Sequence, residues 1–257
     1  MRAGRPPPMD PVAHTLTGAA LGTAGLRRAS PLATAALLIG ANAPDVDILS
    51  ALGGPYSTLA FRRGWTHGIL AIAVWPFLVT GALLLYDRWI RRRADPAADP
   101  ARAAALLGVA ALALASHAAL DWLNNYGIRL LMPFDRRWFY GDALFIIDPW
   151  IWLALGAAVF LAYSARAAAL AAWAVFWGAT SLLVLLAPQV PFAARVVWIA
   201  GVVAAAAVRA AGLVPVRSGR AERVARAATV AIAAYVAIAA YAKLPARAEV
   251  ARDAETR

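Results

Sequence analysis

The chain has 257 residues, of which 62% are hydrophobic and only 15% are charged. A soluble globular domain carries roughly 45–50% apolar and about 25% charged residues, so this composition indicates an integral membrane protein. The abundance of apolar residues excludes intrinsic disorder, and the lack of a fixed period excludes a repeat array. Since the chain has no cysteine, disulfides, thiolate metal sites and cysteine nucleophiles are also excluded.

Eight apolar stretches follow one another along the chain, and most approach the ~20 residues that a helix needs to cross the bilayer. They cover residues 12–26, 31–50, 67–87, 103–123, 144–164, 167–187, 192–213 and 224–243. The first is short, and Asn42, Pro44 and the following acids break the second, so these two are either half-spans or helices packed inside the bundle. We therefore predict an all-α, polytopic membrane helix bundle with about 6–8 hydrophobic helices.

The motifs divide the chain into four regions. Residues 1–11 are polar and rich in proline, which predicts a disordered N-terminal extension with Met9 as an alternative start. Residues 12–150 hold all the chemistry-bearing motifs and predict a helical, hydrolase-like region with a metal site. Residues 151–245 predict additional transmembrane helices, and residues 246–257 predict a flexible C-terminal tail.

The formal net charge of +11 comes from 24 arginines and one lysine against 14 acidic residues. The arginines cluster between apolar runs, as in cytoplasmic loops, so we expect a multi-pass inner-membrane protein in contact with the lipid bilayer and no nucleic-acid partner. Two basic segments, within residues 88–102 and 209–226, lie on one side if runs four to seven all cross. The positive-inside rule makes that side cytoplasmic, which places the polar motifs near the extracytoplasmic face.

The three histidines of the chain, His14, His67 and His117, all lie beside apolar runs near that same predicted face. Ionisable groups at membrane depth are costly and tend to be paired, metal-bound or functional. His117 and Asp121 are four residues apart, so on a helix they share one face. They could bind one metal ion together, or hold each other by a hydrogen bond.

Carboxylates lie beside two prolines of the chain, Pro44 and Pro149. Asp45 and Asp47 come directly after Pro44, so they lie at a helix end or turn, where both can approach one cation. An ordinary interfacial turn is the alternative. Asp148 precedes Pro149 and is either a simple helix N-cap or a partner of the site.

Two further features concern arginine and glycine. Arg63 stands four residues before His67, and its planar fork suits a phosphoryl group, so we expect it to contact substrate or a site carboxylate. The alternative is an anchor that places its charge among lipid headgroups. Gly18 and Gly22 form a small-residue stripe that lets another helix approach closely.

Taken in order, these motifs resemble those of the prokaryotic membrane-bound metal-dependent hydrolases, whose best-known members are LexA-regulated inner-membrane proteins. The matching elements are His14, Pro44-Asp45-x-Asp47, Arg63-Gly64-x-Thr66-His67, His117-x-x-x-Asp121, Tyr126-Gly127 and Ile147-Asp148-Pro149. The resemblance covers residues 9–150. It implies a distant similarity to zinc-dependent phospholipase C and the single-strand-specific nucleases, and hence phosphoester chemistry at a His- and Asp-rich metal cluster. Having three histidines, this chain offers fewer ligands than a full three-metal cluster uses.

We therefore predict a membrane-embedded, metal-dependent hydrolase that uses metal-bound water on a small-molecule or lipid phosphoester. Histidine and carboxylate ligands suit one or two divalent ions, with Zn²⁺ favoured. The expected metal ligands are His14, Asp45, Asp47, His67, His117, Asp121 and Asp148. The expected catalytic residues are Asp45, His117, Asp121 and Arg63. The alternatives are a non-catalytic membrane protein with a structural His/Asp metal site, and a cation or proton transporter.

Overall fold

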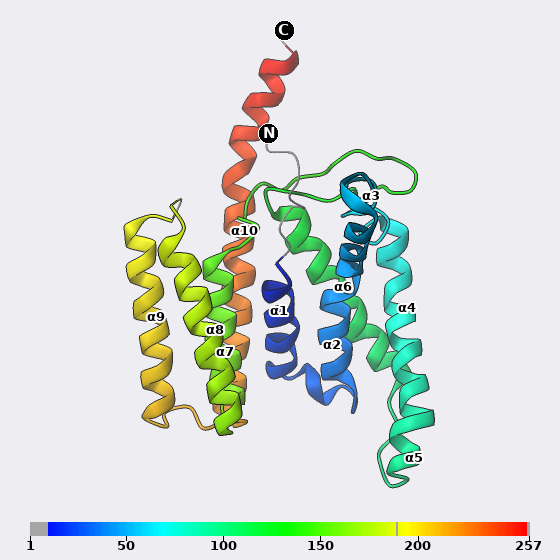
Figure 1. Ribbon diagram of the computed structural model, residues 1–257, viewed down its shortest axis with the longest axis vertical. Coiled ribbons are helices and arrows are strands. Elements are labelled where there is room, and N and C mark those ends of the chain that lie inside the picture. The colour runs from blue at the N-terminus through cyan, green and yellow to red at the C-terminus, as the bar shows by residue number, and fades with distance from the viewer. Residues whose placement is uncertain (1–9, 189, 256–257) are drawn as a thin grey trace.

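The computed structural model describes residues 10–188 and 190–255 as helices joined by connections, of which 124–148 is the longest, with no β-strand in that part of the chain. The predicted all-α fold is confirmed (Figure 1). The α-helices are α1 (Pro11–Thr23), α2 (Ala33–Asn42), α3 (Gly54–Phe61), α4 (Ile69–Tyr86), α5 (Arg92–Ala94), α6 (Ala103–Leu123), α7 (Pro149–Tyr163), α8 (Ala167–Leu186), α9 (Phe192–Ala210) and α10 (Gly219–Glu255). Two 3₁₀ segments, η1 (Leu26–Arg28) and η2 (Ala43–Gly53), and one π-helical turn, η3 (Asp87–Arg91), join some of them.

Six helical segments of the described chain are long and apolar enough to cross a membrane, which confirms the predicted polytopic bundle. They are Ala33–Phe61, Ile69–Ala94, Ala103–Leu123, Ala167–Leu186, Phe192–Ala210 and Gly219–Lys243. Helices α1 and α7 are shorter, with 13 and 15 residues. They pack against each other and against α10, and most residues of α7 are buried. Because other helices cover them, α1 and α7 need not match the thickness of the hydrocarbon.

The start of α1 is tied to α7 by a buried carboxylate. Asp10 caps α1 by accepting a hydrogen bond from the Ala13 N–H at 2.9 Å. Its two oxygens also accept from the Trp152 indole of α7, at 3.0 and 2.9 Å. Burial raises the pKa of the Asp10 carboxyl to about 7. Of the predicted N-terminal extension, residues 1–9 lie outside the described residues, whereas Asp10 and Pro11 begin the bundle.

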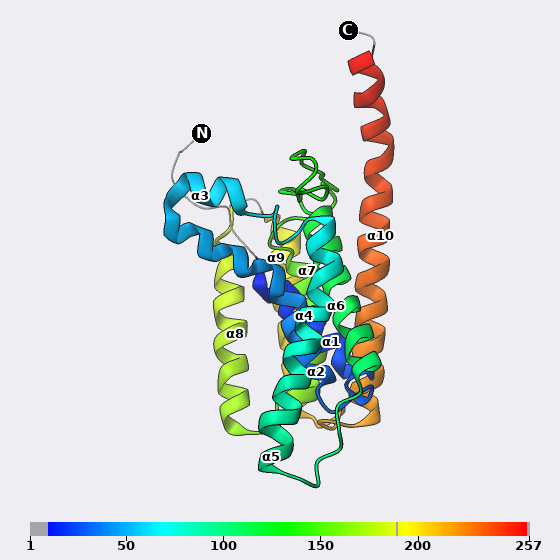
Figure 2. The same ribbon diagram turned by 90° about the vertical axis from the view of Figure 1, so that its right-hand side faces the viewer.

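The α-helix of the second apolar run ends next to Pro44, as the sequence predicted. Helix α2 ends at Asn42, and η2 begins with Ala43 and Pro44. Proline removes one backbone donor and its ring clashes with the carbonyl four residues earlier, so an α-helix does not continue through it. The chain then folds back through α3, and the hairpin of η2 and α3 projects sideways from the bundle (Figure 2).

The two ends of the bundle differ in charge. Helix α5 and the connection between α9 and α10, which carry the two basic segments, lie at one end (Figures 1 and 2). Helix α3 and the long connection 124–148 lie at the other end. The backbone of α10 stays helical to Glu255 and projects beyond the other helices, through most of the region 246–257 where the sequence suggested a tail.

Glycines bring the backbones of the N-terminal helices together. A Cβ atom on Gly18 of α1 would lie 2.7 Å from the carbonyl oxygen of Leu37 in α2. A Cβ atom on Gly40 of α2 would lie 3.0 Å from side-chain atoms of Ala113 and Leu114 in α6. The predicted close approach at Gly18 is therefore present, and a second one at Gly40 joins α2 to α6.

We expect Gly18→Ala to lower the free energy of unfolding by about 1–3 kcal/mol, because the added methyl group meets a backbone carbonyl. The matched control is Gly22→Ala, whose methyl group would lie 3.5 Å from the Leu37 side chain, an ordinary contact. Replacing a helical glycine by alanine otherwise favours the helix by up to about 1 kcal/mol. Thermal unfolding in detergent measures the difference, and equal midpoints for the two variants would contradict this packing.

Candidate metal centre

Four side chains from three segments converge at the end of the bundle that holds α3. Asp45 comes from η2, His67 from the connection before α4, and His117 and Asp121 from α6. Each offers one ligand atom, and these four atoms all lie within 4.8 Å of one another. All four residues are buried. The helical spacing of His117 and Asp121 thus gives the shared face that the sequence predicted, with Nε2 and Oδ2 3.5 Å apart.

The protonation of His117 follows from its backbone partner. Its Nδ1 lies 2.7 Å from the carbonyl oxygen of Ala41 in α2. A carbonyl oxygen can only accept, so Nδ1 carries a proton, and in the neutral ring Nε2 presents a lone pair to the site. The close approach of α2 to α6 at Gly40 brings this carbonyl within reach of the ring.

A hydroxyl group orients His67 in the same way as the carbonyl orients His117, with Nδ1 bound and Nε2 facing the centre. Its Nδ1 lies 2.9 Å from Thr66 Oγ1 and 3.4 Å from Asp47 Oδ2. The Thr66 hydroxyl donates its hydrogen to Asp47 at 3.2 Å, so it accepts from Nδ1 of His67. The Nε2 lone pair of His67 then faces Nε2 of His117 at 3.1 Å. Two lone pairs at this distance repel each other unless a proton or a cation lies between them.

Asp121 uses its two oxygens differently. Oδ1 lies 3.0 Å from Arg63 Nη2, 3.3 Å from Asn124 Nδ2 and 3.3 Å from His14 Nε2, so three nitrogen donors surround it. Oδ2 lies 3.2 Å from Nε2 of His67 and receives no hydrogen bond from residues 10–188 or 190–255. Oδ1 is therefore hydrogen-bonded within the protein, whereas Oδ2 faces the candidate centre and is available to bind a cation.

Asp45 completes the set of acceptors. Oδ1 lies 3.8 Å from Nε2 of His67, and within the described chain neither oxygen of this buried carboxylate has a hydrogen-bond partner. A buried charge without donors is costly. The centre therefore gathers acceptor atoms without matching donors, which fits a divalent cation. A set of two imidazoles and two carboxylates without thiolates suits Zn²⁺, with Mn²⁺ or Fe²⁺ as alternatives.

Two of the other residues expected as ligands surround this group of four. His14 of α1 stacks on His117, with ring centroids 3.9 Å apart, and contacts Oδ1 of Asp121. Asp47 faces Nδ1 of His67, on the side of the ring away from the centre. In this arrangement His14 and Asp47 contact the expected ligands and lie outside the group of four. Carboxylates and carbonyls commonly hold metal-binding histidines in this way.

Asp148 has a different environment. Its Oδ1 accepts from the N–H groups of Trp150 and Ile151 at the start of α7, at 3.0 and 3.3 Å. Its Oδ2 accepts from the Tyr235 hydroxyl of α10 at 2.9 Å. Of the two readings open from the sequence, helix N-cap and partner of the site, the structure shows the N-cap.

Arg63 contacts a site carboxylate. Besides Asp121, its guanidinium donates to Asn124 Oδ1 at 3.0 Å and to the Gly127 carbonyl at 3.2 Å, and it lies over the Tyr126 ring. Its backbone has a φ of 50°, which is uncommon for a residue other than glycine. Its N–H donates to Asp47 at 2.7 Å, which holds this unfavourable conformation in place.

Two positioning residues, Asn124 and Arg129, did not stand out in the sequence. Asn124 follows Asp121 by three residues, a spacing that could have suggested a contact. Arg129 donates to the carbonyls of Leu59, Ala60 and Arg62, at 3.1, 2.8 and 2.8 Å, and so caps the end of α3. These partners are 67 to 70 residues away in the chain, and no local pattern signals them.

Comparisons with known proteins agree with a membrane location. The chain matches the family described as YdjM inner membrane protein over residues 9–190, which include all the expected ligands. It is also 28% identical over 166 residues to the protein YfhP of Bacillus subtilis (strain 168). That alignment covers 61% of this chain and 47% of YfhP, so the chain spans about half the length of this relative. No solved structure matches the chain.

We expect the metal-stripped protein to bind one Zn²⁺ at this centre, and Asp45→Asn and His117→Ala each to weaken binding by more than about 100-fold, since each removes a ligand. Asp142→Asn is the matched control, because Asp142 is an exposed carboxylate in the connection at the same end of the bundle. Isothermal titration and elemental analysis of the purified proteins measure this. The centre is misassigned if Asp45→Asn binds zinc as tightly as Asp142→Asn.

We expect Arg63→Lys to weaken zinc binding by about 10- to 100-fold, the usual effect of losing a residue that orients a ligand. Lysine keeps the charge but lacks the fork that joins Asp121, Asn124 and Gly127. Arg137→Lys is the control, because its side chain is 73% exposed and pairs with Asp135 at the same end of the bundle. If both variants bind zinc as the original chain does, Arg63 does not hold Asp121 in place.

Proposed function

We propose that this chain, which belongs to the YdjM inner membrane protein family, is a metal-dependent hydrolase of phosphoesters. One observation carries the proposal. Two imidazole lone pairs, the Asp45 carboxylate and Oδ2 of Asp121 converge within 4.8 Å inside the helix bundle, and these carboxylate oxygens receive no hydrogen bond from the described residues. Such a group is costly unless a cation compensates it, and costly polar groups in membranes tend to be functional.

The chemistry of the reaction divides among these residues. His67, His117, Asp121 and Asp45 would hold the divalent cation, which, when bound, would supply a nucleophilic water at neutral pH and withdraw charge from phosphoryl oxygens. Neither oxygen of Asp45 has a hydrogen-bond partner among the described residues, so this carboxylate can accept the proton of the attacking water as the new oxygen–phosphorus bond forms. When the bond to the leaving alcohol breaks, Asp45 returns that proton to the leaving oxygen. Arg63 acts through Asp121 as a positioning residue.

The arrangement of the ends supports hydrolysis outside the cytoplasm. The candidate centre lies at the end of the bundle that holds α3, whereas the two basic segments lie at the opposite end (Figure 1). By the positive-inside rule, the basic end faces the cytoplasm. We therefore place the active site near the extracytoplasmic face.

Hydrolysis of chromogenic phosphoesters tests the function. We expect the metal-stripped protein to be inactive on bis(p-nitrophenyl) phosphate and p-nitrophenyl phosphate, and Zn²⁺ or Mn²⁺ to restore turnover of at least one. Asp45→Asn should lower kcat by about 100-fold or more, since it removes a ligand and a general base, whereas Asp142→Asn should not. Metal binding without turnover would instead support a structural metal site, and the absence of both would favour a transporter.

A further inference from the structure

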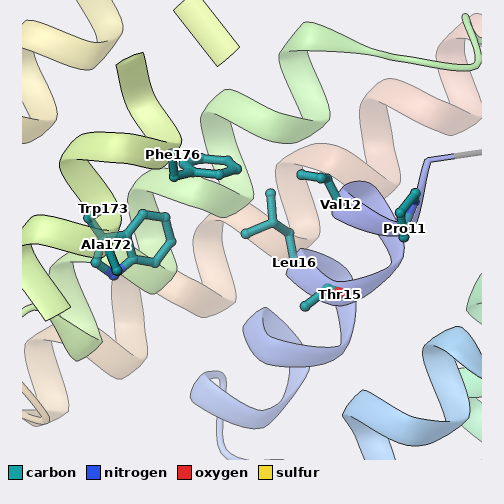
Figure 3. Close-up of a pocket in the computed structure, with 7 residues that line it drawn as sticks. All are labelled: Pro11, Val12, Thr15, Leu16, Ala172, Trp173 and Phe176. Carbon is teal, nitrogen blue, oxygen red and sulfur yellow. The ribbon is translucent and has the colours of Figure 1, made fainter. Parts of the chain in front are cut away.

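Two surfaces of the bundle offer different contacts to lipid. The first is an apolar groove of about 380 Å³ between α1 and α8, in which Val12 and Leu16 face Trp173 and Phe176 (Figure 3). Among the 7 residues drawn along it, Thr15 is the polar one and none is charged. The acyl chain of any lipid suits such a groove, so the groove does not distinguish one headgroup from another.

The second surface is charged and lies at the end of the bundle that carries the two basic segments (Figure 1). Glu222, in the first turn of α10, is buried, with 3% of its side chain exposed, and three guanidinium groups surround its carboxylate. Arg28 approaches both oxygens, with Nη1 3.0 Å from Oε1 and Nη2 2.5 Å from Oε2. Nη2 of Arg27 lies 3.9 Å from Oε2, and Nη2 of Arg226 donates to Oε1. We call these three arginines and Glu222 the arginine cluster.

The arginine cluster joins segments that are far apart in the chain, and the backbone helps to fix its geometry. Gly25, between α1 and η1, has a φ of 133°, which favours glycine. A Cβ atom on Gly25 would lie 3.4 Å from Oε1 of Glu222, so this turn lies directly against the carboxylate. Nε of Arg226 donates to the Ala24 carbonyl at 2.9 Å. The guanidinium groups of η1 and α10 are therefore held beside each other, although 194 residues separate Arg28 from Glu222.

The arginine cluster carries more positive than negative charge. Its three arginines face one carboxylate, which leaves two positive charges uncompensated within the cluster. A further arginine, Arg102, donates to the Arg28 carbonyl at 3.2 Å and adds to the positive charge beside it. The side chains of Arg28 and Arg226 are 65% and 58% exposed, so part of each guanidinium is open to an anion. Guanidinium forks match the oxygens of a phosphate.

The arginine cluster lies where lipid phosphates are found. Glu222 and Arg226 are in the first turns of the candidate span Gly219–Lys243, and Arg102 directly precedes the candidate span Ala103–Leu123. The ends of membrane spans lie at the headgroup layer. Arginines at this level also orient a chain in the membrane, but that role requires only charge. It does not require a buried carboxylate that holds the guanidinium groups together, whereas a headgroup site gains affinity from arginines that are positioned beforehand.

We propose that the arginine cluster binds the headgroup of a lipid with two phosphates, of the cardiolipin type. Two phosphodiesters joined through one glycerol carry two negative charges close together, and so match the two uncompensated charges of the cluster. A lipid with one phosphate compensates only one of them. The bound headgroup reduces the repulsion between the guanidinium groups and bridges η1 to α10. This site is at the opposite end of the bundle from the candidate metal centre, and it does not depend on the proposed hydrolase function.

Native mass spectrometry of the delipidated protein in detergent tests this site, with cardiolipin and phosphatidylglycerol titrated at equal phosphate concentration. We expect the first cardiolipin to bind at least about 10-fold more tightly than phosphatidylglycerol. Arg28→Gln and Arg226→Gln should each weaken cardiolipin binding by about 5-fold, the usual contribution of one basic residue near anionic headgroups. Arg93→Gln is the matched control and should not weaken it, because Arg93 is exposed in α5 at the same end of the bundle but lies outside the cluster.

A milder variant guards against misfolding. Arg27 is the most distant of the three arginines from Glu222, so Arg27→Gln removes one charge and leaves the two closer ion pairs in place. We expect it to weaken cardiolipin binding while the protein elutes from size-exclusion chromatography as the original chain does. Equal cardiolipin affinities of Arg27→Gln and Arg93→Gln would overturn the site, and so would equal affinities of the original chain for the two lipids.

Inorganic pyrophosphate distinguishes a lipid from a soluble anion, because it carries two phosphates without acyl chains. We expect it not to displace cardiolipin at equal concentration. Pyrophosphate that binds as tightly as cardiolipin, and that binds less tightly to Arg28→Gln, would assign the cluster to a soluble phosphate and overturn the lipid. None of these measurements involves turnover or zinc, so a failure of the lipid site leaves the proposed hydrolase to its own test.

Discussion

The ion pair between Arg63 and Asp121 is the interaction on which the candidate centre depends. Both side chains are buried, with 1% and 2% exposed, and their nitrogen and oxygen lie 3.0 Å apart. Breaking a buried pair leaves one charge uncompensated and typically costs about 3–5 kcal/mol. The pair joins the connection before α4 to the end of α6, so it brings His67 and His117 to the same place. It also occupies one oxygen of Asp121 and leaves the other for the centre.

Close helix packing supplies the other constraint. Gly40 lets α2 approach α6, and the next residue, Ala41, presents its carbonyl to His117. On the other side of α2, Gly18 brings α1 into backbone contact, which places His14 against the ring of His117. The close packing of α2 on α6 at Gly40 therefore determines that Nε2 of His117, and not Nδ1, faces the centre. These contacts couple helix packing to the protonation of His117 at the candidate centre.

Local sequence patterns predicted the relations that lie within one segment. The apolar runs correspond to the helices, the break at Pro44 is present, and His117 and Asp121 share a face because an α-helix repeats every 3.6 residues. The sequence also predicted that the three histidines lie near one end of the bundle. The lengths of the apolar runs indicate how many times the chain crosses the membrane between one histidine and the next.

Relations between distant segments could not be predicted in the same way. Asp148 was expected either as a partner of the metal site or, from its place before Pro149, as a helix N-cap, and the hydrogen bonds that it accepts from Trp150 and Ile151 show the N-cap. The carbonyl of Ala41 carries no residue-specific signal at all. Nor does the pattern around Arg129 reveal that its guanidinium caps α3. Such contacts depend on how helices pack, which one sequence does not specify locally.

X-ray absorption at the zinc edge of the zinc-loaded protein tests the central claim most directly. We expect nitrogen and oxygen ligands at about 2.0–2.2 Å. We also expect the outer-shell scattering of two imidazoles, one of which disappears in His67→Ala. A zinc shell without imidazole scattering, or one that His67→Ala leaves unchanged, would contradict a centre built on His67 and His117.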